Sequence, residues 1–225
     1  MNSIKKNIII ICVVLSIISI SLSGCINQDD KYKKNKINNP VIGENILKDP
    51  GFENISSGYW DVAGYITTNI TPITHNGELY GFKIENNTLK YNNQIKYNGE
   101  TSIYIEGVDV FDITVFNNWY QLINDTDLIP HGENIELSCW IKTKNAEDVL
   151  LMIQCWDSED LSLDNMIKSQ TSKSYYESIN GTISWQKYSF KLIEVPSDTK
   201  VITARFGLIG TGEVWFDDVD LHTIS

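Results

Sequence analysis

The chain has 225 residues, 42% of them hydrophobic, and its 18 basic and 29 acidic side chains give a formal net charge of −11. A chain of this length can bury a sizeable core. The acidic balance argues against nucleic acid and anionic lipid headgroups as partners, whereas a neutral ligand such as a sugar is compatible with it.

Residues 1–24 have the three-part pattern of a secretory signal peptide. Lys5 and Lys6 precede an apolar run, and "LSGC" follows that run. The run is short for a spanning helix, which needs about 20 apolar residues, although a retained signal anchor is the alternative. "LSGC" resembles a prokaryotic lipobox, which implies a lipid on Cys25 and an extracytoplasmic chain anchored to the cell membrane.

Residues 25–42 form a polar segment between this signal and the rest of the chain. The stretch "INQDDKYKKNKINNP" is rich in Lys and Asn and almost without apolar side chains. Such a composition cannot bury enough apolar surface to fold, so we expect a flexible, lipid-anchored tether.

Residues 43–225 consist of short apolar or aromatic runs that are separated by turn residues. Among them are "TSIYIEGV", "NIELSCWIKT", "DVLLMIQCWD", "KVITARFGLIG" and "EVWFDDVDLHTI". Several alternate with period two and are rich in β-branched and aromatic residues, which is typical of antiparallel strands. The sequence therefore predicts an all-β chain with a single β-sandwich domain.

Alternation along three of these runs divides core positions from outward positions. The core set is Ile135, Leu137, Cys139, Ile141, Val149, Leu151, Ile153, Cys155, Ile202, Ala204, Phe206 and Leu208. The outward set includes Trp140, Trp156, Gln154 and Arg205, and we add Gln121 from the run "WYQ". Aromatic platforms beside a few hydrogen-bonding groups are typical of a sugar site. The alternative is that a loop or the N-terminal segment covers the outward tryptophans.

Cys139 and Cys155 are the two cysteines that remain for the exported domain, since Cys12 lies in the signal and Cys25 at the lipid site. They occupy neighbouring runs on either side of "KNAED". A disulfide in an oxidising compartment and two buried free thiols are both compatible with this placement.

The order of the runs resembles a known family. The domain opens with "NILKDPGFEN", continues with "YNGETSIYIEG" and "WYQLI", and ends with "ARFGLIGTGEVWFDDVDL". These stretches resemble the carbohydrate-binding modules of families 4, 9 and 22, which are jelly-roll sandwiches related to galactose-binding domains. The usual opening is closer to "NGGFE", from which "KDPGFE" departs. The resemblance implies core or end-sealing roles for Trp60, Trp119, Trp185 and Trp215.

The same resemblance implies a structural calcium ion where the first and last strands meet. Carried over to this chain, its carboxylate ligands are Glu53 and the pair Asp217 and Asp218, with Asp217 preferred. Calcium takes several oxygen ligands, and its charge would relieve repulsion between neighbouring carboxylates. Strand alternation would point Asp218 away from Asp217.

The motifs of common enzymes are missing from the sequence. His75, His131 and His222 are scattered, and there is no Gly-x-Ser-x-Gly, P-loop or His-Glu-x-x-His pattern. We therefore expect a non-catalytic cell-surface lipoprotein that binds a polysaccharide or glycan and contains structural Ca²⁺. The alternative is a surface adhesion or assembly domain that binds a protein partner.

Overall fold

The computed structural model describes residues 43–64, 70–84, 87–108 and 115–225, which belong to one compact unit spanning residues 39–225. The predicted signal peptide, the lipidation site Cys25 and the tether over 25–42 lie outside the described residues. Within these ranges, no helix is long and apolar enough to cross a membrane.

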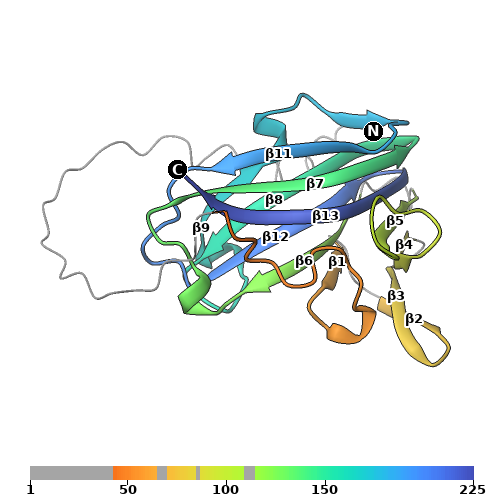
Figure 1. The fold of residues 1–225 in the computed structure, drawn as a ribbon, viewed down its shortest axis with the longest axis horizontal. Helices are drawn as coiled ribbons and strands as arrows, with labels where there is room; N and C mark the ends of the chain where they lie inside the picture. Colours follow the sequence, from red (N-terminus) through yellow and green to blue (C-terminus); the bar gives the residue numbers. More distant parts are fainter. Residues whose placement is uncertain (1–42, 65–69, 85–86, 109–114) are drawn as a thin grey trace, which may run out of the picture. The chain divides into compact units, whose positions relative to one another are not determined.

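The described chain folds as a β-sandwich of two antiparallel sheets (Figure 1), which confirms the predicted all-β, jelly-roll architecture. Helical structure in these ranges is limited to four 3₁₀ turns of three residues each, η1 (Ile55–Ser57), η2 (Thr126–Leu128), η3 (Leu163–Asn165) and η4 (Ser172–Ser174). Strand-forming side chains and frequent turn residues account for this preference.

Within the described ranges, the first sheet has six strands and the second has seven. The path of the first sheet is β1 (Asp61–Gly64), β6 (Phe116–Ile123), β12 (Val201–Ile209), β8 (Ala146–Trp156) and β10 (Ile179–Gly181), and β9 (Met166–Thr171) also pairs with β8. The strand order of the second sheet is β11 (Gln186–Leu192), β7 (Asn134–Lys144), β13 (Gly212–Ile224), β5 (Ser102–Gly107), β4 (Asn87–Asn92), β3 (Glu78–Ile84) and β2 (Ile70–His75).

The core between the sheets contains the side chains that alternation assigned to it. All twelve predicted core positions of β7, β8 and β12 are buried, and Trp60 and Trp119 join them. Full burial of one large aliphatic or aromatic side chain contributes roughly 1.5–3 kcal/mol. Several outward side chains of the same strands are buried as well, among them Ser138, Trp156 and Thr203.

Strands β7 and β8 are consecutive in the chain but belong to opposite sheets. They are joined at Asn145, whose φ of 50° is left-handed, a conformation that Asn tolerates better than most residues. Cys139 on β7 and Cys155 on β8 therefore belong to different sheets, and each points into the core. Both are buried free thiols. Of the two possibilities left open by the sequence, the structure shows two free thiols and no disulfide between Cys139 and Cys155. Burial raises the pKa of Cys155 to about 11.

The N-terminal segment of the described chain lies along the last strand (Figure 1, orange beside dark blue). The Gly43 N–H donates to the Thr223 carbonyl at 3.2 Å, and the Ile46 N–H donates to the Leu221 carbonyl at 2.8 Å. This pairing carries residues 43–60 across to the six-stranded sheet, where they form one wall of the groove described next.

Candidate functional site

A hydrogen-bonded network crosses the outer face of the six-stranded sheet. Register places Asp61 of β1 opposite Tyr120 of β6, and Tyr120 opposite Arg205 of β12. The Tyr120 hydroxyl donates to Asp61 Oδ2 at 3.1 Å, and the Arg205 guanidinium carbon lies 4.6 Å from the centre of the Tyr120 ring. Three strands thereby align a carboxylate, a phenol and a cation.

Gln154 of β8 and Asn118 of β6 hold the Arg205 guanidinium from either side. Arg205 Nε donates to Gln154 Oε1 at 2.8 Å, and Nη1 donates to Asn118 Oδ1 at 2.9 Å. The Gln154 amide in turn donates to the Met166 sulfur at 3.1 Å. These contacts fix the plane of the guanidinium over the Tyr120 ring.

The electrostatics of this network favour a fixed positive charge beside a neutral phenol. Burial raises the pKa of Tyr120 to about 12, with Asp61 adding to the effect, so the hydroxyl stays a donor at neutral pH. Burial lowers the pKa of Arg205. Because the ordinary pKa of a guanidinium is far above neutral, Arg205 remains charged. Among the ion pairs of the described residues, none includes Arg205.

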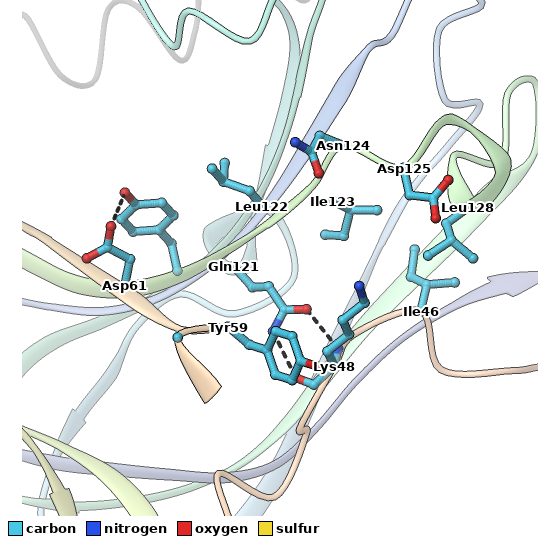
Figure 2. Close-up of a pocket in the computed structure, with 12 residues that line it drawn as sticks. Ile46, Lys48, Tyr59, Asp61, Gln121, Leu122, Ile123, Asn124, Asp125 and Leu128 are labelled. Atoms are coloured by element: carbon cyan, nitrogen blue, oxygen red, sulfur yellow. Dashed lines mark hydrogen bonds between the residues drawn. The ribbon is translucent and has the colours of Figure 1, made fainter. Parts of the chain in front are cut away.

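A groove of about 330 Å³ continues from Tyr120 along β6 (Figure 2). Tyr59 and Leu122 line it with 45% and 43% of their surfaces exposed. Lys48 lies with its ammonium 5.5 Å from the centre of the Tyr59 ring. The remaining lining side chains are Ile46, Asp61, Gln121, Ile123, Asn124, Asp125 and Leu128. The groove therefore offers partly exposed rings surrounded by charged and amide groups.

Gln121, predicted as a ligand contact, lines the groove with its amide bound to backbone, and its contact with a ligand stays a prediction. Only 4% of its surface is exposed. Its amide accepts from the Lys48 N–H at 2.7 Å and donates to the Lys48 carbonyl at 2.8 Å, as Figure 2 shows. The amide oxygen and nitrogen of Gln121 are thus both hydrogen-bonded to the backbone of Lys48. These bonds hold the N-terminal segment in place as the groove wall.

The two tryptophans predicted to share a ligand face do not lie together. Trp156 is on the six-stranded sheet with 2% exposure, and its indole N–H donates to Thr203 Oγ1 at 3.2 Å. Trp140 is on β7 of the other sheet, where Tyr97 stacks on it. The structure therefore keeps Arg205, Gln154 and Trp156 on one face, where Thr203 links the buried Trp156 to Gln154, and separates Trp140 from all three.

Two of the carboxylates predicted to bind calcium, Asp217 and Glu53, hold one loop. Asp217 is fully buried, and its Oδ2 accepts from the N–H groups of Tyr97 at 2.7 Å and Asn98 at 3.1 Å. Glu53 accepts from the N–H of Glu100 at 2.9 Å. Both carboxylates thus bind the backbone of residues 93–101, the connection between β4 and β5.

Gly99 is required at the centre of this loop. Its φ of 59° is left-handed, and a Cβ there would lie 1.8 Å from Glu53 Oε1. Only glycine allows so close an approach between the loop and the carboxylate. We refer to residues 93–101 with Glu53 and Asp217 as the loop clasp.

Asp218 does not point away from its neighbour, so the prediction from alternation is wrong here. The register of β13 shifts between Asp217 and Asp220, and Asp218 has a φ of 44°. Its carboxylate lies 3.4 Å from the Asn98 side-chain nitrogen, on the loop that Asp217 also contacts. A β-bulge breaks the period of two and brings both aspartates to the same loop.

The clasp does not fit a calcium ion in this arrangement. Calcium takes six to eight oxygen ligands, whereas the oxygens of Asp217 already accept from three N–H groups, of Tyr97, Asn98 and Asp218. Those donors direct their positive ends at the carboxylate, where a cation would bind. No group of three acidic, His or Cys side chains suited to a metal occurs in the described part of the chain. The calcium site stays a prediction.

Sequence comparisons give one curated relative. No protein-family model matches the chain. It is 28% identical over 129 residues to an uncharacterized HTH-type transcriptional regulator, YbfP, of Bacillus subtilis (strain 168), and the match covers 57% of this chain. The chain spans 41% of the length of that regulator.

Several solved structures are similar to this chain. The enzymatically active domain of tailspike protein 4 of bacteriophage CBA120 matches with a TM-score of 0.55 and 17% identity, over 80% of this chain and 21% of that one. TmCBM61 in complex with β-1,4-galactotriose matches at 0.47 and 15%, over 80% and 99%. The CBM22-2 xylan-binding domain of Paenibacillus barcinonensis Xyn10C matches at 0.48 and 13%, over 78% and 98%. Two of these three solved structures are carbohydrate-binding modules.

Sequence reasoning missed several residues of the groove. Tyr120 adjoins Gln121 in the run "WYQ", and core burial of Trp119 would have assigned Tyr120 to the outer face. Tyr59 and Lys48 are in irregular segments that carry no periodic signal. Asp61 begins a strand too short for alternation to identify.

We expect calcium to leave the stability of the domain unchanged, because N–H donors satisfy the clasp carboxylates. Thermal unfolding with excess Ca²⁺ and with EDTA should give the same Tm. If the domain had a calcium site, a free Ca²⁺ concentration of 100 times its Kd would stabilise the fold by ~2.7 kcal/mol, enough to shift Tm by several degrees. Such a shift that Glu53→Gln abolishes would establish the calcium site.

Burial of Asp217 should make stability depend on pH. Desolvation raises its pKa from 3.8 to about 6, against the lowering effect of the N–H donors. Between pH 6 and pH 4 the folded chain therefore binds a proton that the unfolded chain lacks, and stability rises as pH falls. Compared with Asp217→Asn, the wild-type chain should gain roughly 1 kcal/mol between pH 7 and pH 5 in urea unfolding. Equal pH profiles would contradict this burial.

Proposed function

We propose that this chain is a non-catalytic carbohydrate-binding protein whose ligand lies in the groove along β6. The observation that carries the proposal is the Arg205 guanidinium, stacked on Tyr120 without a carboxylate partner among the described residues. Sugar rings have apolar C–H faces and a rim of hydroxyls, so they are bound by aromatic faces together with fixed hydrogen-bonding groups.

Each part of the groove has a counterpart in such a ligand. The partly exposed rings of Tyr59 and Tyr120 provide surfaces for pyranose C–H faces. Arg205 lies beside the groove, against Tyr120, and has N–H groups beyond the two that bind Gln154 and Asn118, since a guanidinium has five. The exposed carboxylate of Asp61 accepts from hydroxyls. The network holds these groups before the ligand arrives, which lowers the entropic cost of binding.

The proposal also includes the location of the protein, which is the outer side of the cell membrane. The signal over residues 1–24 and the "LSGC" pattern support export and lipid attachment at Cys25. The polar tether over 25–42 would then hold the sandwich off the membrane surface. The net charge of −11 agrees with a neutral glycan as ligand. A calcium ion at the clasp awaits the chelation experiment.

Binding should depend on the groove rings. Titration of the full chain with xylan and β-1,4-galactan should show that Tyr120→Ala and Tyr59→Ala each weaken binding about 10-fold or more, or ~1.4 kcal/mol. Tyr175→Ala is the matched control, because Tyr175 has 49% exposure and does not line the groove. Equal affinity in all three variants, with unchanged Tm, would refute the groove as the binding site.

Lipid attachment should determine where the protein is found. In cell fractionation the wild-type chain should sediment with membranes, and mass spectrometry should find a diacylglycerol-modified Cys25. Cys25→Ser should lose that modification, while Cys12→Ser, a change inside the signal, should keep it. An unmodified Cys25 that begins no mature chain would contradict the lipobox.

A further inference from the structure

Three aromatic side chains form a cluster on the outer face of the seven-stranded sheet, on the opposite side of the sandwich from the groove. Tyr97 stacks on Trp140 of β7 with 3.8 Å between ring centres and 14° between planes. Trp185, just before β11, meets Tyr97 edge-on at 5.9 Å. Tyr97 is 41% exposed, and both tryptophans are partly exposed. We call these three residues the Tyr97 platform.

The position of Tyr97 is fixed at a substantial cost. Its N–H binds the Asp217 carboxylate at 2.7 Å, and Asp217 is fully buried. No ion pair of the described residues compensates that charge, although burying a carboxylate is expensive. The next residue, Asp218, adopts a φ of 44°, which is strained for a side chain other than glycine.

Polar groups border the platform. Asn98 follows Tyr97 in the loop, with its amide 3.4 Å from the Asp218 carboxylate. Lys187 of β11 is exposed and lies directly opposite Trp140 in the register. A small aromatic surface with an amide, a carboxylate and an ammonium at its rim matches a sugar ring better than a protein partner, whose interface takes about 800 Å² per side.

From this geometry we propose that the Tyr97 platform is a second glycan-binding site. The proposal rests on carbohydrate binding as the proposed function, and adds that one domain has two ligand surfaces on opposite sheets. A monomer would then hold two polysaccharide chains at once. Glycan cross-linking follows as an activity that neither surface has alone.

The test uses the full chain carrying Cys25→Ser, shown to be monomeric by light scattering, so that lipid does not create valency. Soluble xylan and β-1,4-galactan are the probes, with binding followed by titration and cross-linking by turbidity. The parent protein should cross-link its glycan. Trp185→Ala and Tyr97→Ala should each abolish cross-linking while the groove still binds, and Trp185→Phe should restore it. Tyr175→Ala is the control.

The outcomes separate the two sites. If the platform variants cross-link as well as the parent, or the parent binds a single chain that Tyr120→Ala removes, the second site is refuted and the groove stands. If Tyr120→Ala leaves binding intact while Trp185→Ala removes it, the groove is refuted and the platform stands. Failure of the parent to bind any glycan, with a cooperative melt, would overturn both. Melting curves of every variant exclude unfolding as the cause.

Discussion

The backbone hydrogen bonds that the 93–101 loop donates to Asp217 and Glu53 are the constraint on which both candidate surfaces depend. Asp217 belongs to the last strand and Glu53 to the N-terminal segment, so the loop joins the two ends of the domain. On one side it fixes Tyr97 over Trp140. On the other it supports the segment whose residues Lys48 and Tyr59 form the groove wall. The two carboxylates thus bind one loop to both ends of the domain.

The division into core and surface could be predicted from the sequence because it depends only on period two. Alternation assigned Cys139, Cys155 and their neighbours to the core, and the structure buries them all. The assignment of strands to sheets could not be predicted in this way. The connection at Asn145 takes the chain from one sheet to the other, and an outward residue on β7 consequently faces the opposite direction from one on β8. Trp140 and Trp156 were grouped because the sequence alone does not contain that crossing.

The candidate site shows the same limit at the level of single residues. Arg205 and Gln154 were predicted together and do meet, because register on adjacent strands follows from pattern and length. The hydrogen bonds of Gln121 could not be predicted, because its partner is the backbone of Lys48, 73 positions away. Asp218 failed because a bulge shifts the strand by a residue, and no periodic signal marks a bulge. Long-range contacts and local irregularities are the two kinds of information that patterns omit.

The pairing of the N-terminal segment with β13 has a mechanical consequence. Its hydrogen bonds follow one another in opposite chain directions, from Gly43 with Thr223 to Ile46 with Leu221 and Pro50 with Val219. Force applied at Gly43 would load them one at a time, so the segment would peel away at low tension. Because the same segment forms the groove wall, pulling on the domain would displace that wall and open the groove well before the sandwich itself unfolds.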